Sequence, residues 1–186
     1  MNTSKYSTQN DLLLQKLLTW YQQDNNLKKM LQIINGESYI SLRIVDWFAT
    51  NYAKKYFTVY NIEKNNNTER FKVYIDYKLK LKAYSKKRFD PFCRWDRVNI
   101  PFDNNSQIQT TIGQLNFFKW ALENKVIDYI EQHHKEIEND MNDRNSTSKR
   151  KQNISNQKTR KKREELSISA TKSIKKEEVE IRVTFN

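Results

Sequence analysis

The chain has 186 residues, 37% hydrophobic and 12% aromatic, which is enough to bury one sizeable core without requiring a second full domain. Its 34 Lys and Arg exceed its 22 Asp and Glu, and the resulting formal charge of +12 favours anionic partners. The single cysteine, Cys93, excludes an internal disulfide and a zinc-binding thiol cluster. Because no apolar signal segment and no run of about 18 apolar residues occurs, we expect an intracellular protein that does not span a membrane.

Apolar side chains recur with helical spacing in three successive stretches at the start of the chain. Thr8 and Asp11 have the spacing of a capping box for the first stretch. Gly36 favours a helix end after the second, because glycine accepts positive φ, and Ser38 can cap the third. The pattern predicts three helices, over about 10–23, 27–34 and 38–55.

The hydrophobic period changes to two between residues 71 and 83, where apolar side chains alternate with lysine, tyrosine and aspartate. This alternation is typical of a strand with one buried face. We therefore predict that 71–83 forms the centre of a small antiparallel sheet. Its hairpin partner is predicted at 57–62, and a further strand at 98–102, where Pro101 favours an edge or an end.

Helical spacing resumes from about 112 to 141, with a capping-box pair, Thr111 and Gln114, at its start and a turn signal at Asn124. The region is one long helix or two. These elements predict an α+β fold in which N-terminal helices and a long C-terminal helical region pack on a small antiparallel sheet. The compact α+β domain is expected over 1–142.

The last quarter of the chain is strongly basic. Residues 144–163 hold nine basic side chains and no acidic one, so 143–164 is expected to be a basic disordered linker that cannot offset the entropy cost of ordering. A C-terminal arm over 165–186 ends in strict apolar alternation, which predicts a strand added to a sheet of this chain or of a partner. Its apolar residues are Val179, Ile181, Val183 and Phe185.

Three groups of cations are candidates for contact with nucleic acid. Lysines of the alternating stretch would share one sheet face with Tyr74 and Tyr84, which could hold phosphates and stack bases. A second group interleaves with aromatic residues around the Asp90-Pro91 turn, and a third forms a bipartite basic pattern. The candidate residues are Lys72, Lys78, Lys80, Lys82, Lys86, Lys87, Arg88, Arg94, Arg97, Lys149, Arg150, Lys151, Lys158, Arg160, Lys161, Lys162 and Arg163.

Each group also has a structural interpretation. Lysines on a strand can simply keep it from aggregating. Phe89, Phe92 and Trp95 can anchor the turn in the core, and the bipartite segment can be a solubilising linker. The sequence leaves these alternatives open.

No catalytic, metal or cofactor site is indicated. His133 and His134 are adjacent, so on a helix they point about 100° apart and cannot chelate as an i, i+4 pair does. Phosphate-loop and dinucleotide glycine patterns are excluded, because the chain has only two glycines. We expect no enzyme activity, no metal and no cofactor, unless folding brings carboxylates such as Asp90 and Asp96 together in a closed pocket.

Four stretches together resemble a family of uncharacterised proteins of nucleocytoplasmic large DNA viruses, including giant viruses of protists. They are INGESYISLRIVDWFATNYAKK over 34–55, FDPFCR over 89–94, TTIGQLNFFKWA over 110–121 and ELSISA over 165–170. The resemblance implies a virus-factory, nuclear or virion setting and carries no assigned activity or functional residues.

The leading hypothesis is therefore a non-enzymatic viral protein that binds DNA or RNA electrostatically, in packaging, genome organisation or transcription. The alternative is a structural or adaptor component of the virion that binds a viral protein partner through its C-terminal arm. Neither hypothesis involves a membrane.

Overall fold

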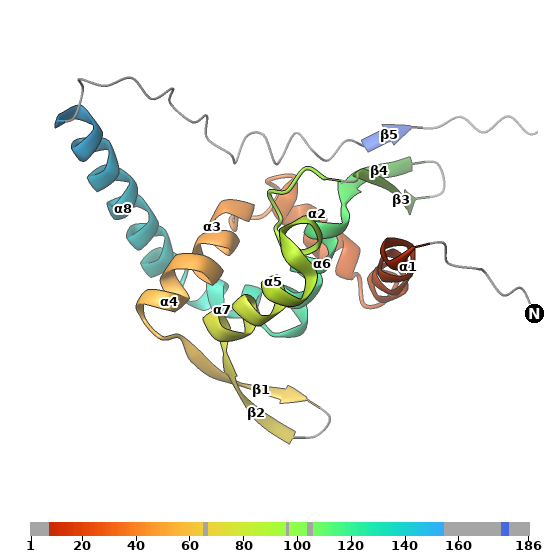
Figure 1. Cartoon of the computed structure of the whole chain (residues 1–186), viewed down its shortest axis with the longest axis horizontal. Helices are drawn as coiled ribbons and strands as arrows, with labels where there is room; N and C mark the ends of the chain where they lie inside the picture. Colours follow the sequence, from red (N-terminus) through yellow and green to blue (C-terminus); the bar gives the residue numbers. More distant parts are fainter. Residues whose placement is uncertain (1–7, 65–66, 96, 104–105, 155–175, 179–186) are drawn as a thin grey trace, which may run out of the picture.

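The computed structural model describes residues 8–64, 67–95, 97–103, 106–154 and 176–178. Helices form most of the molecule, and two small antiparallel sheets lie at its periphery (Figure 1). The α+β class expected from the sequence is therefore confirmed. No helix in the described ranges is long and apolar enough to cross a membrane.

The first two helices form as the sequence predicts. α1 (Gln9–Tyr21) begins with the expected capping box, in which Thr8 Oγ1 accepts a hydrogen bond from the Asp11 N–H at 3.3 Å. In return, Asp11 Oδ2 accepts a hydrogen bond from the Thr8 N–H at 3.0 Å. α2 (Asn26–Ile34) ends just before Gly36, whose φ is +76°. Both helices are confirmed.

The third predicted helix consists of three consecutive segments and begins later than expected. α3 (Leu42–Trp47) has Ser41 as its N-cap, whereas the Ser38 hydroxyl accepts a hydrogen bond ahead of the helix. A π-helical turn, η1 (Phe48–Tyr52), follows and leads into α4 (Ala53–Lys55). The predicted end near residue 55 is confirmed.

The strand predicted at 71–83 is wrong, because α5 (Val73–Phe89) is a helix. Residues two apart on a helix differ by about 200° in direction, so strict alternation contains two i, i+4 series on opposite faces. One series, which includes Val73 and Tyr77, is buried, whereas Ile75 of the other is 54% exposed. The alternating sequence thus fits a helix with one buried face and one exposed apolar stripe.

The first sheet is a hairpin of β1 (Val59–Lys64) and β2 (Asn67–Lys72). The strand predicted at 57–62 is shifted by two residues, and its partner ends where the helix α5 begins. Ile62 and Phe71 are the buried residues of the pair. The hairpin extends away from the helices (Figure 1).

The second sheet has the antiparallel order β3, β4, β5, formed by β3 (Arg97–Asp103), β4 (Ser106–Thr111) and β5 (Lys176–Glu178). The strand predicted with Pro101 at an edge is confirmed as β3. β4 carries no apolar alternation, because Ile108 is its only large apolar side chain, and the sequence pattern does not predict it. β5 brings a segment from near the end of the chain onto β4.

The C-terminal helical region is divided into three helices. α6 (Ile112–Glu123) begins where the Thr111 hydroxyl accepts a hydrogen bond from the Gln114 N–H at 3.1 Å. Nearly all of α6 is buried, and it contacts α1, α2, α5 and β4 at the centre of the core. The predicted turn is confirmed, because Lys125 has a φ of +56° just before α7 (Val126–Gln132).

α8 (His134–Ile154) packs through its first half, where Ile137 and Met141 are buried, and then projects away from the body (Figure 1). The structure therefore differs from the predicted linker, because helix occupies 143–154. Lysine, arginine and glutamine are good helix formers, and extending a packed helix is easier than nucleating a new one. The remainder of the predicted linker lies outside the described residues.

Candidate nucleic-acid interface

The lysines of the alternating stretch do not share one face. Lys78 and Lys82 lie on one side of α5 and are exposed, whereas Lys80 points about 200° away from each and is half-buried. Lys72 is exposed at the end of β2. The predicted one-sided lysine surface is therefore wrong, because a helix separates side chains that a strand would align.

Part of the second predicted group is exposed near Trp95, and we use the name Trp95 cluster for Trp95, Lys87 at its ring, and the sequence neighbours Arg94 and Arg97. The Lys87 Nζ lies 3.8 Å from the centroid of the Trp95 ring, which is a cation–π contact. Trp95 is 53% exposed, and the other three residues are exposed as well.

The aromatic residues of this stretch divide between core and surface. Phe89 is fully buried and Phe92 is half-buried, so these two anchor the turn as the structural interpretation expects. Trp95 does not follow them into the core. It is the aromatic side chain of the predicted group that remains available for stacking.

Two arginines, one beside the cluster and one within it, donate hydrogen bonds to neutral side chains. Arg88 Nε donates to Asn10 Oδ1 at 2.7 Å, and Arg97 donates from Nη1 to Gln109 Oε1 at 3.0 Å. Neither contact neutralises the guanidinium charge. Lys86 is exposed as well.

The third predicted group lies partly on α8. Positions Lys149, Arg150 and Lys151 fall in its projecting second half. The remaining predicted residues lie outside the described residues, and they are Lys158, Arg160, Lys161, Lys162, Arg163 and the partner-strand residues Val179, Ile181, Val183 and Phe185.

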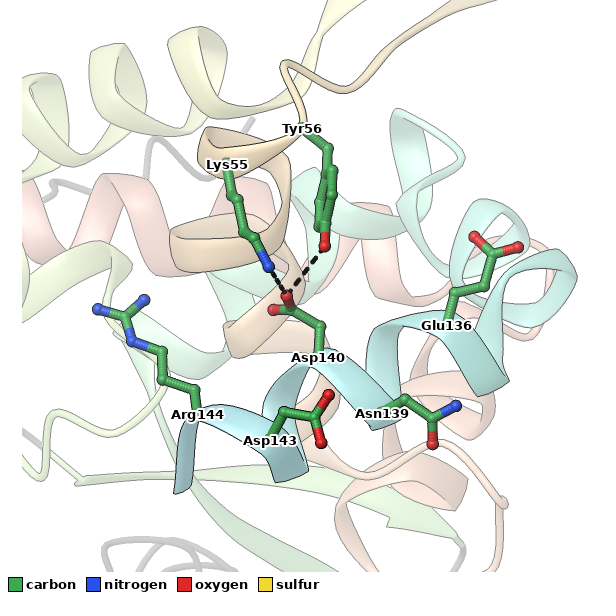
Figure 2. Close-up of a pocket in the computed structure, with 7 residues that line it drawn as sticks. All are labelled: Lys55, Tyr56, Glu136, Asn139, Asp140, Asp143 and Arg144. Atoms are coloured by element: carbon green, nitrogen blue, oxygen red, sulfur yellow. Dashed lines mark hydrogen bonds and ion pairs between the residues drawn. The ribbon is translucent and has the colours of Figure 1, made fainter. Parts of the chain in front are cut away.

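Asp140 anchors α8 to the body. Figure 2 shows Lys55 and Tyr56 reaching toward this carboxylate, where Lys55 Nζ forms an ion pair and the Tyr56 hydroxyl donates at 3.2 Å. The other carboxylate oxygen, Oδ2, accepts a hydrogen bond from Trp47 Nε1 at 3.0 Å. Arg144, one turn further, donates to Asn51 Oδ1 at 2.9 Å. These contacts fix the direction in which α8 leaves the body.

A cavity of about 550 Å³ lies at this anchor, and its residues of both charge signs favour a structural role. Burial alone would raise the pKa of Asp140, but hydrogen bonds from Lys55 and Trp47 hold it below its ordinary value. The hydrogen bond to Asp140 raises the pKa of Lys55. Both groups therefore keep their charges at neutral pH, which suits an ion pair rather than proton transfer. The lining residues are Lys55, Tyr56, Glu136, Asn139, Asp140, Asp143 and Arg144.

Among the described carboxyl groups, Asp46 on α3 has the pKa furthest from its ordinary value. Burial, together with the nearby Asp90, raises its pKa to about 7. The Asp90 carboxylate itself accepts a hydrogen bond from the Phe92 N–H at 2.8 Å. Asp46 lines neither the cavity at the α8 anchor nor a second, smaller one between α1, α5 and α6.

The described residues bring no three His, Cys, Asp or Glu side chains together as metal ligands would lie. His133 stacks on Tyr129, and His134 contacts Tyr39 edge-on. Sequence reasoning missed the Asp140 anchor, because its partners are 84 to 93 positions away and no local pattern marks them.

The structure thus defines a small α+β protein with an exposed basic and aromatic cluster and a projecting basic helix. The whole chain, residues 1–186, matches a family of unknown function, DUF7197, and belongs to it. It is 44% identical over 163 residues to the uncharacterized protein L507 of Acanthamoeba polyphaga mimivirus. The match covers 84% of this chain and 63% of that relative, so the chain spans less than two thirds of the relative's length. No solved structure matches the chain. The resemblance to an uncharacterised giant-virus family is confirmed.

Proposed function

We propose that this chain is a non-enzymatic viral protein that binds DNA or RNA through electrostatic contacts, in the virus factory, the host nucleus or the virion. The observation that carries the proposal is the exposed Trp95 with Lys87 against its ring. Single-stranded nucleic acids are bound by aromatic side chains that stack on bases and cations that contact phosphates. The Trp95 cluster offers both.

The α8 helix supports the same proposal. Its first half is held by the Asp140 anchor, and its second half carries Lys149, Arg150 and Lys151 away from the body (Figure 1). The anchor thus ties these three helix positions to the body of the domain. Packaging, genome organisation and transcription all require such sequence-independent phosphate contacts.

The test compares two charge-matched triple variants of the full chain. One replaces Lys87, Arg94 and Arg97 by glutamine, and the control replaces three lysines elsewhere. Fluorescence anisotropy with labelled single- and double-stranded DNA and RNA should show binding that weakens with salt. The slope of log affinity against log salt on duplex DNA should fall by about two to three in the first variant and by less in the control. The control lysines, Lys28, Lys29 and Lys135, are exposed.

Two further variants separate stacking from charge. Trp95→Leu should lower affinity for single strands by about fivefold or more and affect duplexes less, because only unpaired bases can stack. Replacing Lys149, Arg150 and Lys151 by glutamine should weaken binding to every nucleic acid. Salt-independent binding, or equal losses in the cluster and control variants, would contradict the proposal.

The adaptor alternative depends on the predicted strand of Val179 to Phe185. The residues just before it, Lys176–Glu178, pair with β4 of the same chain, so the arm reaches a sheet edge of its own domain. Ile181→Asp with Val183→Asp should lower the melting temperature if the strand docks on this sheet. The same change should abolish association with a viral protein, at unchanged stability, if the strand docks on a partner.

A further inference from the structure

A groove of about 280 Å³ lies between α1, α5 and α6, and it shares no lining residue with the Trp95 cluster or the α8 anchor. Its apolar wall is made by Leu17, Phe89 and Trp120, each of which is at most 3% exposed. An apolar wall of this kind lowers the local dielectric, so charges at the rim act more strongly than on an open surface.

Lysines from four different elements converge on this groove: Lys16 of α1, Lys64 of β1, Lys80 of α5 and Lys119 of α6. The groove also contains two carboxylates, Asp76 and Glu123, so two positive charges are in surplus. The fold thus brings together four elements that are distant in sequence, and each of them contributes one lysine.

The pairing within the groove leaves two cations uncompensated. Lys119 forms an ion pair with Glu123, and Lys64 donates to the neutral amide oxygen of Asn124 at 2.9 Å. The other two lysines, Lys16 and Lys80, have no ion pair or hydrogen bond among the described residues. Their ammonium groups are therefore free to bind an anion.

The remaining carboxylate is turned toward the protein. Asp76 Oδ1 accepts a hydrogen bond from Trp120 Nε1 at 2.6 Å, which fixes its position on the wall. Tyr84 lines the groove as a half-buried ring, stacked on Phe89 with centroids 6.1 Å apart. An anion held by the two free lysines would thus lie beside an aromatic surface.

We propose that this groove binds the phosphoryl group of a ligand about one nucleotide in size, with the phosphate on Lys16 and Lys80 and a ring against Tyr84. The volume lies just below the ~300–1,000 Å³ typical of small-molecule sites, which suits a ligand of about one nucleotide. The ligand is a free nucleotide or a terminal nucleotide of a strand. The site does not depend on the Trp95 cluster or the basic helix.

Isothermal titration of the full chain with inorganic phosphate, adenosine and AMP tests the site directly. AMP should bind at least tenfold more tightly than adenosine, which lacks the phosphate. Lys16→Gln with Lys80→Gln should lower the AMP affinity at least tenfold. The matched control, Lys78→Gln with Lys82→Gln, removes the same charge from the exposed face of α5 and should change it less than twofold.

A short single-stranded oligonucleotide with a 5′ phosphate, and the same strand without it, distinguishes the source of the ligand. The groove is assigned to a strand end if the phosphorylated strand binds and AMP does not. In that case only the Lys16 and Lys80 variant should lose affinity for the phosphorylated strand. Equal losses in both lysine pairs would overturn the site, because general charge would then explain binding. No binding of any phosphate probe would overturn it too, while salt-dependent binding of long nucleic acid could persist.

Discussion

A Cβ added at Gly113 would lie 2.7 Å from the main-chain oxygen of Asp90. This contact joins the first turn of α6 to the end of α5, and the Lys87 carbonyl oxygen lies 3.2 Å from the same point. Glycine is therefore required at this position by the close approach of two main chains.

Gly113→Ala should lower the free energy of unfolding by about 1–3 kcal/mol, because neither carbonyl can move aside easily. Helix propensity alone predicts the opposite, a gain of about 1 kcal/mol. Urea denaturation decides between these signs. Gly36→Ala provides a comparison, since it meets no atom within 4 Å and adds only the strain of its φ of +76°.

Ser85→Gly should stabilise the protein by about 1 kcal/mol, because Ser85 has a φ of +65° and a ψ of 166°, a conformation that essentially only glycine adopts without strain. Ser85→Ala retains the Cβ and should give no such gain. Thermal melting of the two variants measures the difference. Equal melting temperatures would show that the strain at this position is negligible.

Asp46→Asn should alter how stability depends on pH. The folded pKa of about 7 exceeds the ordinary value of 3.8, so between these values the folded protein holds a proton that the unfolded chain has lost. The contribution of Asp46 to stability is present below pH 3.8 and is lost as pH rises to about 7.

The advantage of Asp46→Asn over the parent should therefore grow by up to about 4 kcal/mol between pH 4 and pH 8 and then remain level. Urea denaturation at a series of pH values measures this difference. A flat profile for Asp46→Asn would contradict the raised pKa.

Asp140→Ala should loosen α8, because the side-chain donors of Trp47, Lys55 and Tyr56 lose their acceptor. We expect a loss of about 1–3 kcal/mol in urea denaturation and faster amide exchange in α8. Lys55→Met should cost less than about 1 kcal/mol, because Lys55 is largely exposed. A larger loss from Lys55→Met than from Asp140→Ala would refute the role of Asp140 as the shared acceptor.

Elements with local signals could be predicted from the sequence. The helices α1, α2 and α6 carry capping pairs or terminal glycine beside helical spacing, and each forms near its expected place. The strand predicted at 71–83 was wrong because its alternation contains two helical series, and only tertiary packing decides which faces are buried. β4 has no apolar pattern, since it is largely polar in a sheet at the periphery.

The candidate surfaces divide in the same way. The alternation of cations and aromatic residues near Trp95 is local and could be predicted, whereas the exposed state of Trp95 and the buried state of Phe89 depend on the fold. The groove between α1, α5 and α6 is lined by lysines as far apart in sequence as Lys16 and Lys119, and no spacing within one segment predicts it. The sequence alone therefore shows that the chain is rich in lysine, but not that these lysines line one groove.

The π-helical turn η1 sets how α4 is rotated about the helix axis relative to α3. In this turn the Ala53 N–H donates to the Phe48 carbonyl, which accommodates one more residue than an α-helical turn would. Removing one residue there would rotate α4 by about 100° and turn Lys55 away from Asp140. The length of this segment is consequently fixed by a contact with a helix more than eighty positions away, so insertions and deletions between Phe48 and Tyr52 should be tolerated far less than substitutions on its half-buried side.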